Sequence, residues 1–187
     1  MDLVPGESAV SDWHGEGWKR KIGVSDADEH RWVQGARGGF GRMSRDEKVA
    51  LLSRTPLFEN IDAAHLRVLV YAADHARFAP GDYLVREGGE EAAGFLVVDG
   101  EAEAWSDEDP AMRLRITRGA FIGEGAMIAG LAHRLNVRAV TEVEALRITR
   151  KLFMRVCHEF PELGRMVMSN YARRMASISS ALHTLLP

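Results

Sequence analysis

The sequence predicts a domain of mainly antiparallel β structure, either a barrel or a sandwich, with helices at both ends. Three observations support this fold class. Short apolar segments separated by glycine turns follow one another at regular spacing over residues 78–148. Between them the sequence has none of the long helical crossovers that a parallel sheet needs. Helical periodicity is found before this region and again after it.

Composition limits the number of domains and the class of protein. The chain has 187 residues, a net charge of -3, 46% hydrophobic residues and a mean hydropathy of -0.17. These values suit one soluble domain of about 140 residues with an appendage. A single cysteine, Cys157, cannot form an internal disulfide, and no secretory signal or long apolar segment is present. We therefore expect a cytoplasmic protein without membrane contact.

Residues 1–43 differ from the rest and are predicted to form a flexible arm, followed by a domain over residues 44–187. Three of the four tryptophans lie in this arm, together with glycines and basic residues, and no helical or strand period is sustained there. Residues 13–42 are expected to dock onto a protein partner. Covering a patch of the same chain and stacking on single-stranded nucleic acid are the alternatives.

Two helices are expected to open the domain. Ser44 is followed three residues later by Glu47, which is the pattern of a capping box. A second helix is predicted after Asp62, and its buried face would carry Leu66, Leu69 and Val70.

A series of short strands, interrupted by one short helix, is predicted to follow, and two further helices come after it. Strands are predicted within residues 78–89 and at 95–98, 101–105, 114–117, 118–121, 137–140 and 143–148. Asp99-Gly100 predicts a tight hairpin between the second and third of these, and a short helix is expected at 126–129. Arg138 and Arg147 are expected to point outward from their strands.

A helix over 151–160 should stop at Pro161, and a long helix should follow from Glu162. Its apolar residues are spaced alternately by three and four positions. This stripe predicts either packing on the domain or a homodimer seam over residues 168–185. It comprises Met168, Tyr171, Met175, Ile178, Leu182 and Leu185.

A glycine and a carboxylate stand where a predicted strand gives way to the short helix. Gly123, Glu124, Gly125 and Ala126 would present backbone N–H groups to an anion, and Glu124 could accept hydrogen bonds from a ribose hydroxyl. His133 and Arg134 could then neutralise a phosphate. A bent connection with solvated charges is the alternative.

The ordered series of these features resembles the cyclic nucleotide-binding domain family. The series runs from a first helix through Pro56-Leu57-Phe58, Gly81-Asp82, Arg86-Glu87-Gly88, the Val-Asp-Gly turn, Gly119 and Gly123-Glu124 to two closing helices. The resemblance covers about residues 48–186. It implies a jelly-roll barrel with N-terminal helices and two C-terminal helices, which in this family often close over the ligand or form a dimer seam.

The resemblance also implies a phosphate-binding cassette in which a glutamate holds the ribose and an arginine holds the cyclic phosphate. In an ungapped comparison Gly123, Glu124, Ala126, Val137 and Ala139 match the family pattern. His133 stands in place of the arginine, Ala132 in place of a proline and Asn136 in place of a threonine, with Arg134 one position late. The candidate ligand-binding residues are Gly123, Glu124, Gly125, Ala126, His133, Arg134, Leu135 and Asn136.

Three alternatives follow from this variant cassette. Arg134 could reach the phosphate through a one-residue slip of the loop, although Val137 and Ala139 must stay on one face. His133 could serve as a weaker phosphate contact. The domain could also have lost its nucleotide and keep its fold as a scaffold for another ligand or for a protein partner, in which case it would act as a protein interaction module.

The leading hypothesis is a non-enzymatic regulatory sensor that binds cyclic AMP, cyclic GMP or a similar phosphate ligand and signals through its C-terminal helices. No catalytic motif, metal-ligand spacing or cofactor motif is present in the sequence. The resembling transcription factors carry a helix-turn-helix after this domain. Since residues 48–186 are taken up by the domain, direct DNA binding is not expected.

Overall fold

The computed structural model describes residues 43–109, 111 and 113–185, with side chains described as far as residue 177. These residues belong to one compact unit. The predicted arm, including the expected partner-docking residues 13–42, lies outside the described residues apart from Met43.

The first two helices form where their capping residues predict them. In α4 (Arg45–Ser53) the Ser44 Oγ accepts a bond from the Glu47 N–H at 3.2 Å, and the Glu47 carboxylate accepts one from the Ser44 N–H at 2.6 Å. A 3₁₀ turn, η1 (Pro56–Phe58), precedes α5 (Ala63–Ala72), which Asp62 caps at 2.7 Å. The predicted buried face of α5 is confirmed at Leu66, Leu69 and Val70.

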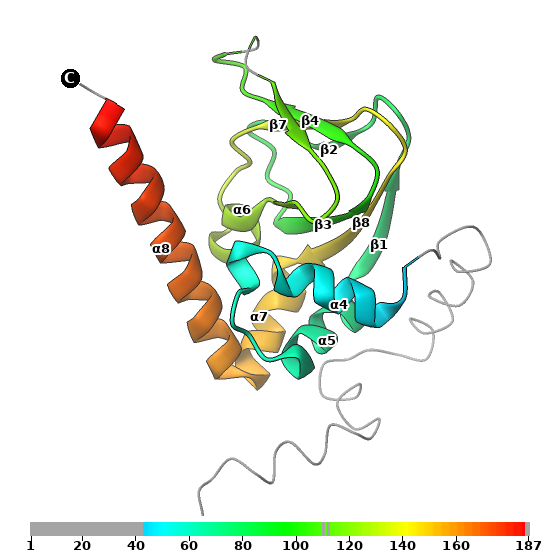
Figure 1. The fold of residues 1–187 in the computed structure, drawn as a ribbon, viewed down its shortest axis with the longest axis vertical. Coiled ribbons are helices and arrows are strands. Elements are labelled where there is room, and N and C mark those ends of the chain that lie inside the picture. The colour runs from blue at the N-terminus through cyan, green and yellow to red at the C-terminus, as the bar shows by residue number, and fades with distance from the viewer. Residues whose placement is uncertain (1–42, 110, 112, 186–187) are drawn as a thin grey trace, which may run out of the picture. The chain divides into compact units, whose positions relative to one another are not determined.

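Among the described residues, eight strands form two antiparallel sheets that face each other across the core (Figure 1). The first sheet has the order β1-β8-β3-β6 and the second has the order β2-β7-β4-β5. This confirms the predicted jelly-roll architecture. The strands are β1 (Asp74–Phe78), β2 (Tyr83–Val85), β3 (Ala93–Asp99), β4 (Ala102–Trp105), β5 (Leu114–Ile116), β6 (Phe121–Ile122), β7 (Asn136–Ala139) and β8 (Val143–Thr149).

The predicted hairpin at Asp99-Gly100 is wrong. The strands on either side of this turn, β3 and β4, do not pair with each other but lie in different sheets. The turn therefore carries the chain across the core from the first sheet to the second. Gly100 has a φ of 88°, and a Cβ there would lie 2.1 Å from the carbonyl oxygen of Glu142. This close approach of two backbone segments requires the glycine.

The expectation that Arg147 points outward is also wrong. In β8 the side chains of Val143 and Ala145 belong to the core between the sheets, and alternation along the strand puts Arg147 on the same face. Its antiparallel partner in β3 is Phe95, another core residue. On β7, by contrast, Val137 and Ala139 belong to the core, so Arg138 points outward as predicted.

The other face of the first sheet is covered by α4, α5 and α7 (Arg150–Glu159), as Figure 1 shows. Leu96, Leu146 and Ile148 on that face are fully buried. At its edge, Phe121 of β6 meets Phe58 of η1 edge to face, with 5.4 Å between ring centroids. The helices therefore support the strand that leads into the candidate cassette.

Three further helices lie where the sequence predicts them, one after β6 and two after β8. The short helix α6 (Glu124–Ala129) begins two residues earlier than predicted, and α7 is followed directly by α8 (Pro161–Leu185). Pro161 ends one helix and also occupies the first position of the next, where its missing N–H is not needed. None of the described helices is both long and apolar enough to cross a membrane.

The side of α8 that packs on the domain carries Leu163, Val167 and Asn170. Asn170 Nδ2 donates to the carbonyls of Leu57 and Glu59 at 3.1 and 2.9 Å, which fixes the helix against η1. Met168 and Met175, from the predicted stripe, are 51% and 39% exposed, so they belong to another face. The stripe side chains from residue 178 onward lie outside the described ones.

Candidate functional site

The candidate cassette begins at Gly123, between β6 and α6. Its φ of 80° lies in the left-handed region, and a Cβ there would lie 2.6 Å from the Ala93 carbonyl oxygen and 2.9 Å from Cε1 of His133. Only glycine fits this position. As the N-cap residue of α6, Gly123 offers no side-chain oxygen to the N–H groups of the first turn. These are the N–H groups that the sequence analysis predicts to bind an anion.

Glu124 occupies the first position of α6 and is paired with the last helix. Its side chain is only 11% exposed, and its Oε2 lies 3.3 Å from Nε of Arg174 in α8. Burial raises the pKa of Glu124 above its usual value, and Arg174 opposes that rise. The cassette carboxylate is thus nearly enclosed, with a guanidinium of α8 as its partner.

A second arginine holds the other end of α6. Arg150, the first residue of α7, donates from Nη1 to the carbonyl oxygen of Met127 at 3.3 Å and to that of Ile128. These carbonyls belong to the last turn of α6, where a cation is favourable. We call the two contacts, Arg174 to Glu124 and Arg150 to the last-turn carbonyls, the α6 clamp. It joins the cassette helix to both C-terminal helices.

His133 is buried and points into the domain toward Gly123. Its Nε2 lies 2.9 Å from the carbonyl oxygen of Glu91, and since a carbonyl only accepts, Nε2 carries the proton. Its backbone also bonds to the turn before β3, accepting from the Gly88 N–H at 2.8 Å and donating to Gly89 at 3.0 Å. His133 is therefore held by three hydrogen bonds in the place that the resemblance gives to an arginine.

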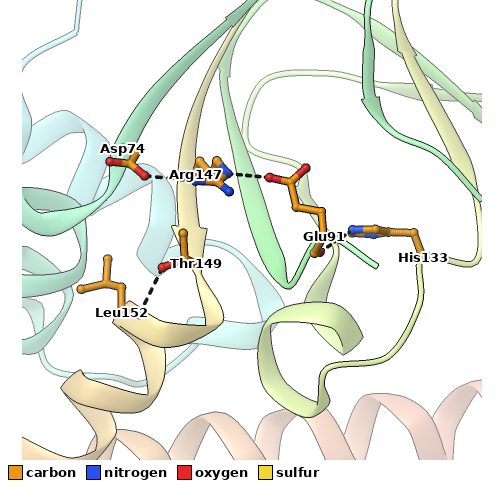
Figure 2. Close-up of polar contacts among 6 residues, drawn as sticks. All are labelled: Asp74, Glu91, His133, Arg147, Thr149 and Leu152. Atoms are coloured by element: carbon orange, nitrogen blue, oxygen red, sulfur yellow. Dashed lines mark hydrogen bonds and ion pairs between the residues drawn. The ribbon is translucent and has the colours of Figure 1, made fainter. Parts of the chain in front are cut away.

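The same Glu91 also contacts Arg147, as Figure 2 shows. Arg147 Nε donates to Glu91 Oε1 at 2.7 Å, and its Nη1 donates to Asp74 Oδ2 at 3.2 Å. The chain of contacts thus runs from Asp74 through Arg147 and Glu91 to His133. It links two strands of the first sheet to the cassette loop.

The loop has the register without a slip. Val137 and Ala139 lie in the core, His133 is buried, and Arg134 is exposed. A slipped loop that brings Arg134 inward is therefore not the arrangement found. Two other predicted ligand-binding residues also differ in exposure. Ala126 is buried in α6, whereas Leu135 is 36% exposed.

Asn136 is buried and ties two loops to the cassette. Its Oδ1 accepts from the Glu87 N–H at 3.1 Å, and its Nδ2 donates to Asp107 Oδ1 at 2.8 Å. Glu87 in turn accepts bonds from the Asp107 N–H and the Ser106 hydroxyl. Asn136 therefore supports the second sheet rather than standing free beside α6.

Sequence reasoning missed the partners of these residues. Glu91, Arg150 and Arg174 are far along the chain from the cassette positions that they contact, and Arg147 is likewise far from Glu91. No local spacing therefore identifies these four residues. The alternation of β8 was the available signal for Arg147, because it places that residue on the face of Val143 and Ala145. Within the described ranges, no three His, Cys, Asp or Glu residues are grouped to hold a metal ion.

A family model for the cyclic nucleotide-binding domain matches residues 75–160. This segment belongs to the cyclic nucleotide-binding domain family. The family is regulatory and generally non-catalytic. In this domain the model covers both sheets and α7, including the candidate cassette at residues 123–139.

Comparisons with individual proteins agree with this assignment. A cAMP-dependent protein kinase regulatory subunit of Emericella nidulans is 31% identical over 109 residues, which are 57% of this chain but only 26% of that subunit. A cyclic nucleotide-binding-like protein from Brucella abortus matches with 29% identity and a TM-score of 0.52, covering 59% of this chain and 97% of its own. The domain therefore corresponds to about a quarter of the kinase subunit.

The fold is also that of the N-terminal domain of a transcriptional regulator from Streptomyces coelicolor A3(2). That structure matches with a TM-score of 0.63 and 22% identity, covering 70% of this chain and 96% of its own. At this identity the likeness concerns the fold of the cyclic nucleotide-binding domain alone.

Proposed function

We propose that this domain is a non-enzymatic cytoplasmic sensor that binds a cyclic nucleotide, cyclic AMP or cyclic GMP, or a similar phosphate ligand, and signals through α7 and α8. The observation that carries the proposal is the environment of Glu124. Glu124 is a nearly enclosed carboxylate at the start of α6, and burial raises its pKa. Burying this charge costs folding free energy, so stability alone does not account for the residue. It is suited to accepting hydrogen bonds from a ligand hydroxyl.

The pairing of Glu124 with Arg174 gives the signal a route. A hydroxyl that bonds to Glu124 competes with Arg174 for the same oxygens, so ligand binding and this contact of α8 are coupled. Arg150 simultaneously ties the last turn of α6 to α7. Any displacement of α6 by a ligand therefore acts on both helices through the α6 clamp.

Homodimerisation through residues 168–185 is part of the same proposal. Met168 and Met175 expose apolar surface on α8 although other residues of the helix pack on the domain. Light scattering on the full chain tests this part. Twice the 20.7 kDa chain mass is expected, and a single chain mass at high concentration would remove the dimer from the proposal.

One observation favours a second function, that of a ligand-free protein interaction module. His133 replaces the arginine, its Nε2 is bonded to Glu91, and Arg134 is exposed. An imidazole cannot provide the bidentate grip of a guanidinium on a phosphate. In this case the cassette keeps its shape without its ligand.

Isothermal titration of the full chain with cyclic AMP, cyclic GMP and cyclic di-GMP separates the two functions. The sensor predicts binding of at least one nucleotide more tightly than about 1 mM, which corresponds to about 4 kcal/mol. Glu124→Gln should then weaken binding at least tenfold. Glu103→Gln is the matched control, because Glu103 is a partly buried, arginine-paired glutamate on the second sheet.

Each outcome decides between the two candidates. Binding that Glu124→Gln removes and Glu103→Gln preserves supports the sensor. Failure of all three nucleotides to bind favours the interaction module, and binding that is unaffected by Glu124→Gln would show that the ligand lies elsewhere.

A further inference from the structure

The core-facing side of the first sheet carries a guanidinium close to the candidate cassette. Arg147 stands opposite Phe95 of β3 and Asp74 of β1, and its neighbours on the same face of β8 are core residues. Its side chain is nevertheless 33% exposed. A charged group on the inner face of a sheet that solvent still reaches is accessible to a small ligand in the same place.

We propose that Arg147 supplies the phosphate contact that the cassette arginine would otherwise make. The proposal rests on the proposed function and assigns one residue of β8 to the anionic part of the ligand. Arginine suits this role because its planar fork binds two phosphate oxygens at once and stays charged at all relevant pH values.

Arg147 and the cassette share one residue. The carboxylate of Glu91 accepts from Arg147 at 2.7 Å, while the carbonyl of the same Glu91 accepts from His133 at 2.9 Å. In Figure 2 Glu91 lies between the two side chains, above α6. A single residue, Glu91, thus connects the Arg147 guanidinium to His133, which stands at the position that the family pattern gives to an arginine.

The existing bonds leave part of Arg147 available. Of its five N–H groups, Nε donates to Glu91 and Nη1 donates to Asp74. Nη2 has no bonding partner among the residues that the structure describes. The two carboxylates fix the guanidinium so that Nη2 can donate to one phosphate oxygen. A grip on two oxygens through Nη1 and Nη2 requires that the longer contact with Asp74 gives way.

The two carboxylates that contact Arg147 should affect anion affinity in the direction opposite to Arg147 itself. Asp74 and Glu91 repel an incoming phosphate, and Asp74 forms the longer of the two contacts with Arg147. Removing the charge of Asp74 should therefore raise the affinity for an anion, whereas removing that of Arg147 should lower it.

The test is titration of cyclic AMP and cyclic GMP into the full chain and four variants. Arg147→Gln is expected to weaken binding at least tenfold and Arg147→Lys by a smaller factor. Asp74→Asn should strengthen binding about twofold or more. Arg138→Gln is the matched control, because Arg138 is a half-exposed, glutamate-paired strand arginine on the outer face of the second sheet, and it should stay within twofold of the wild type.

Thermal melting confirms that each variant is folded, and Arg147→Lys keeps the proposal testable if Arg147→Gln unfolds. A parallel titration with inorganic phosphate follows the Arg147 Nε–H signal by NMR. Wild-type binding with Arg147 variants within twofold overturns the assignment and leaves the sensor intact. An Nε–H response to phosphate without nucleotide binding supports Arg147 as the anion contact and overturns the sensor. Absence of both responses overturns both.

Discussion

Nε of Arg174 lies 3.3 Å from Oε2 of Glu124, so the last helix contacts the first residue of the cassette helix directly. The two partners differ in exposure, with 11% of the Glu124 side chain and 41% of the Arg174 side chain accessible to solvent. Solvent therefore screens the pair from one side. We therefore expect the pair to contribute little to stability, whereas its position links α6 directly to α8.

Unequal effects are expected from removing the two partners of this pair. Arg174→Gln leaves a buried carboxylate without its cation, whereas Glu124→Gln removes a charge whose pKa burial has raised. Urea unfolding at pH 7 should therefore show Glu124→Gln near neutral and Arg174→Gln destabilising. The double-mutant cycle should give a coupling of at most about 1 kcal/mol. A larger loss for Glu124→Gln than for Arg174→Gln would contradict this reading.

The turn between the two sheets should not tolerate a side chain. Gly100→Ala places a Cβ 2.1 Å from the Glu142 carbonyl and also strains a φ of 88°. A loss of about 3 kcal/mol or more is expected. Gly88→Ala is the control, because its φ is 75° but its Cβ would meet nothing within 4 Å, so about 1 kcal/mol is expected. Equal losses in chemical denaturation would mean that backbone conformation alone sets the effect.

Acid should weaken the fold through His75. Burial, reinforced by Lys48 and Arg45, lowers the pKa of His75 from 6.5 to about 4. Between these two values the unfolded chain binds a proton that the folded chain does not. The free energy of unfolding should therefore fall as pH drops from 6.5 to 4. His75→Gln should flatten that slope in urea unfolding measured at several pH values, and an unchanged slope would exclude His75 as its source.

Asn136 should matter for stability more than its neighbours in the cassette loop. Asn136→Ala removes the acceptor of the Glu87 N–H and the donor to Asp107, and about 1–3 kcal/mol should be lost. The exposed Arg134→Ala should change the free energy of unfolding by about 0.5 kcal/mol or less. Similar Tm values for the two variants would argue against a supporting role of Asn136.

Local signals in the sequence predicted the helices well. The Ser44 and Glu47 capping box and the Asp62 cap both act within one turn, so the residues that decide these helix starts are adjacent in the chain. Most strands were also recovered, because apolar alternation bounded by glycine does not depend on which strands pair. The strand predicted over 118–121 is wrong, since residues 118 and 119 form a turn and β6 begins at Phe121. The element order and the cassette pattern together indicated the family.

Pairing was the part that the sequence could not provide. Asp99-Gly100 has the residues of a tight hairpin, yet the pairing of β3 with β8 and of β4 with β7 separates its two flanks. Arg147 was expected outside because arginines seldom face a core. Two carboxylates from β1 and from the turn before β3 make the inner position acceptable, and neither is near Arg147 in the chain.

The strand that attaches α6 to the first sheet affects which segment of the domain separates first. The strand before it, β6, has two residues, lies at the edge of the first sheet and pairs only with β3 among the described strands. Separating β6 and α6 leaves the longer ladder between β3 and β8 intact. We therefore expect this segment to open as a small cooperative unit, at a lower cost in free energy than unfolding the domain. Within the described domain, limited proteolysis should accordingly begin near the residues that the family pattern assigns to the ligand.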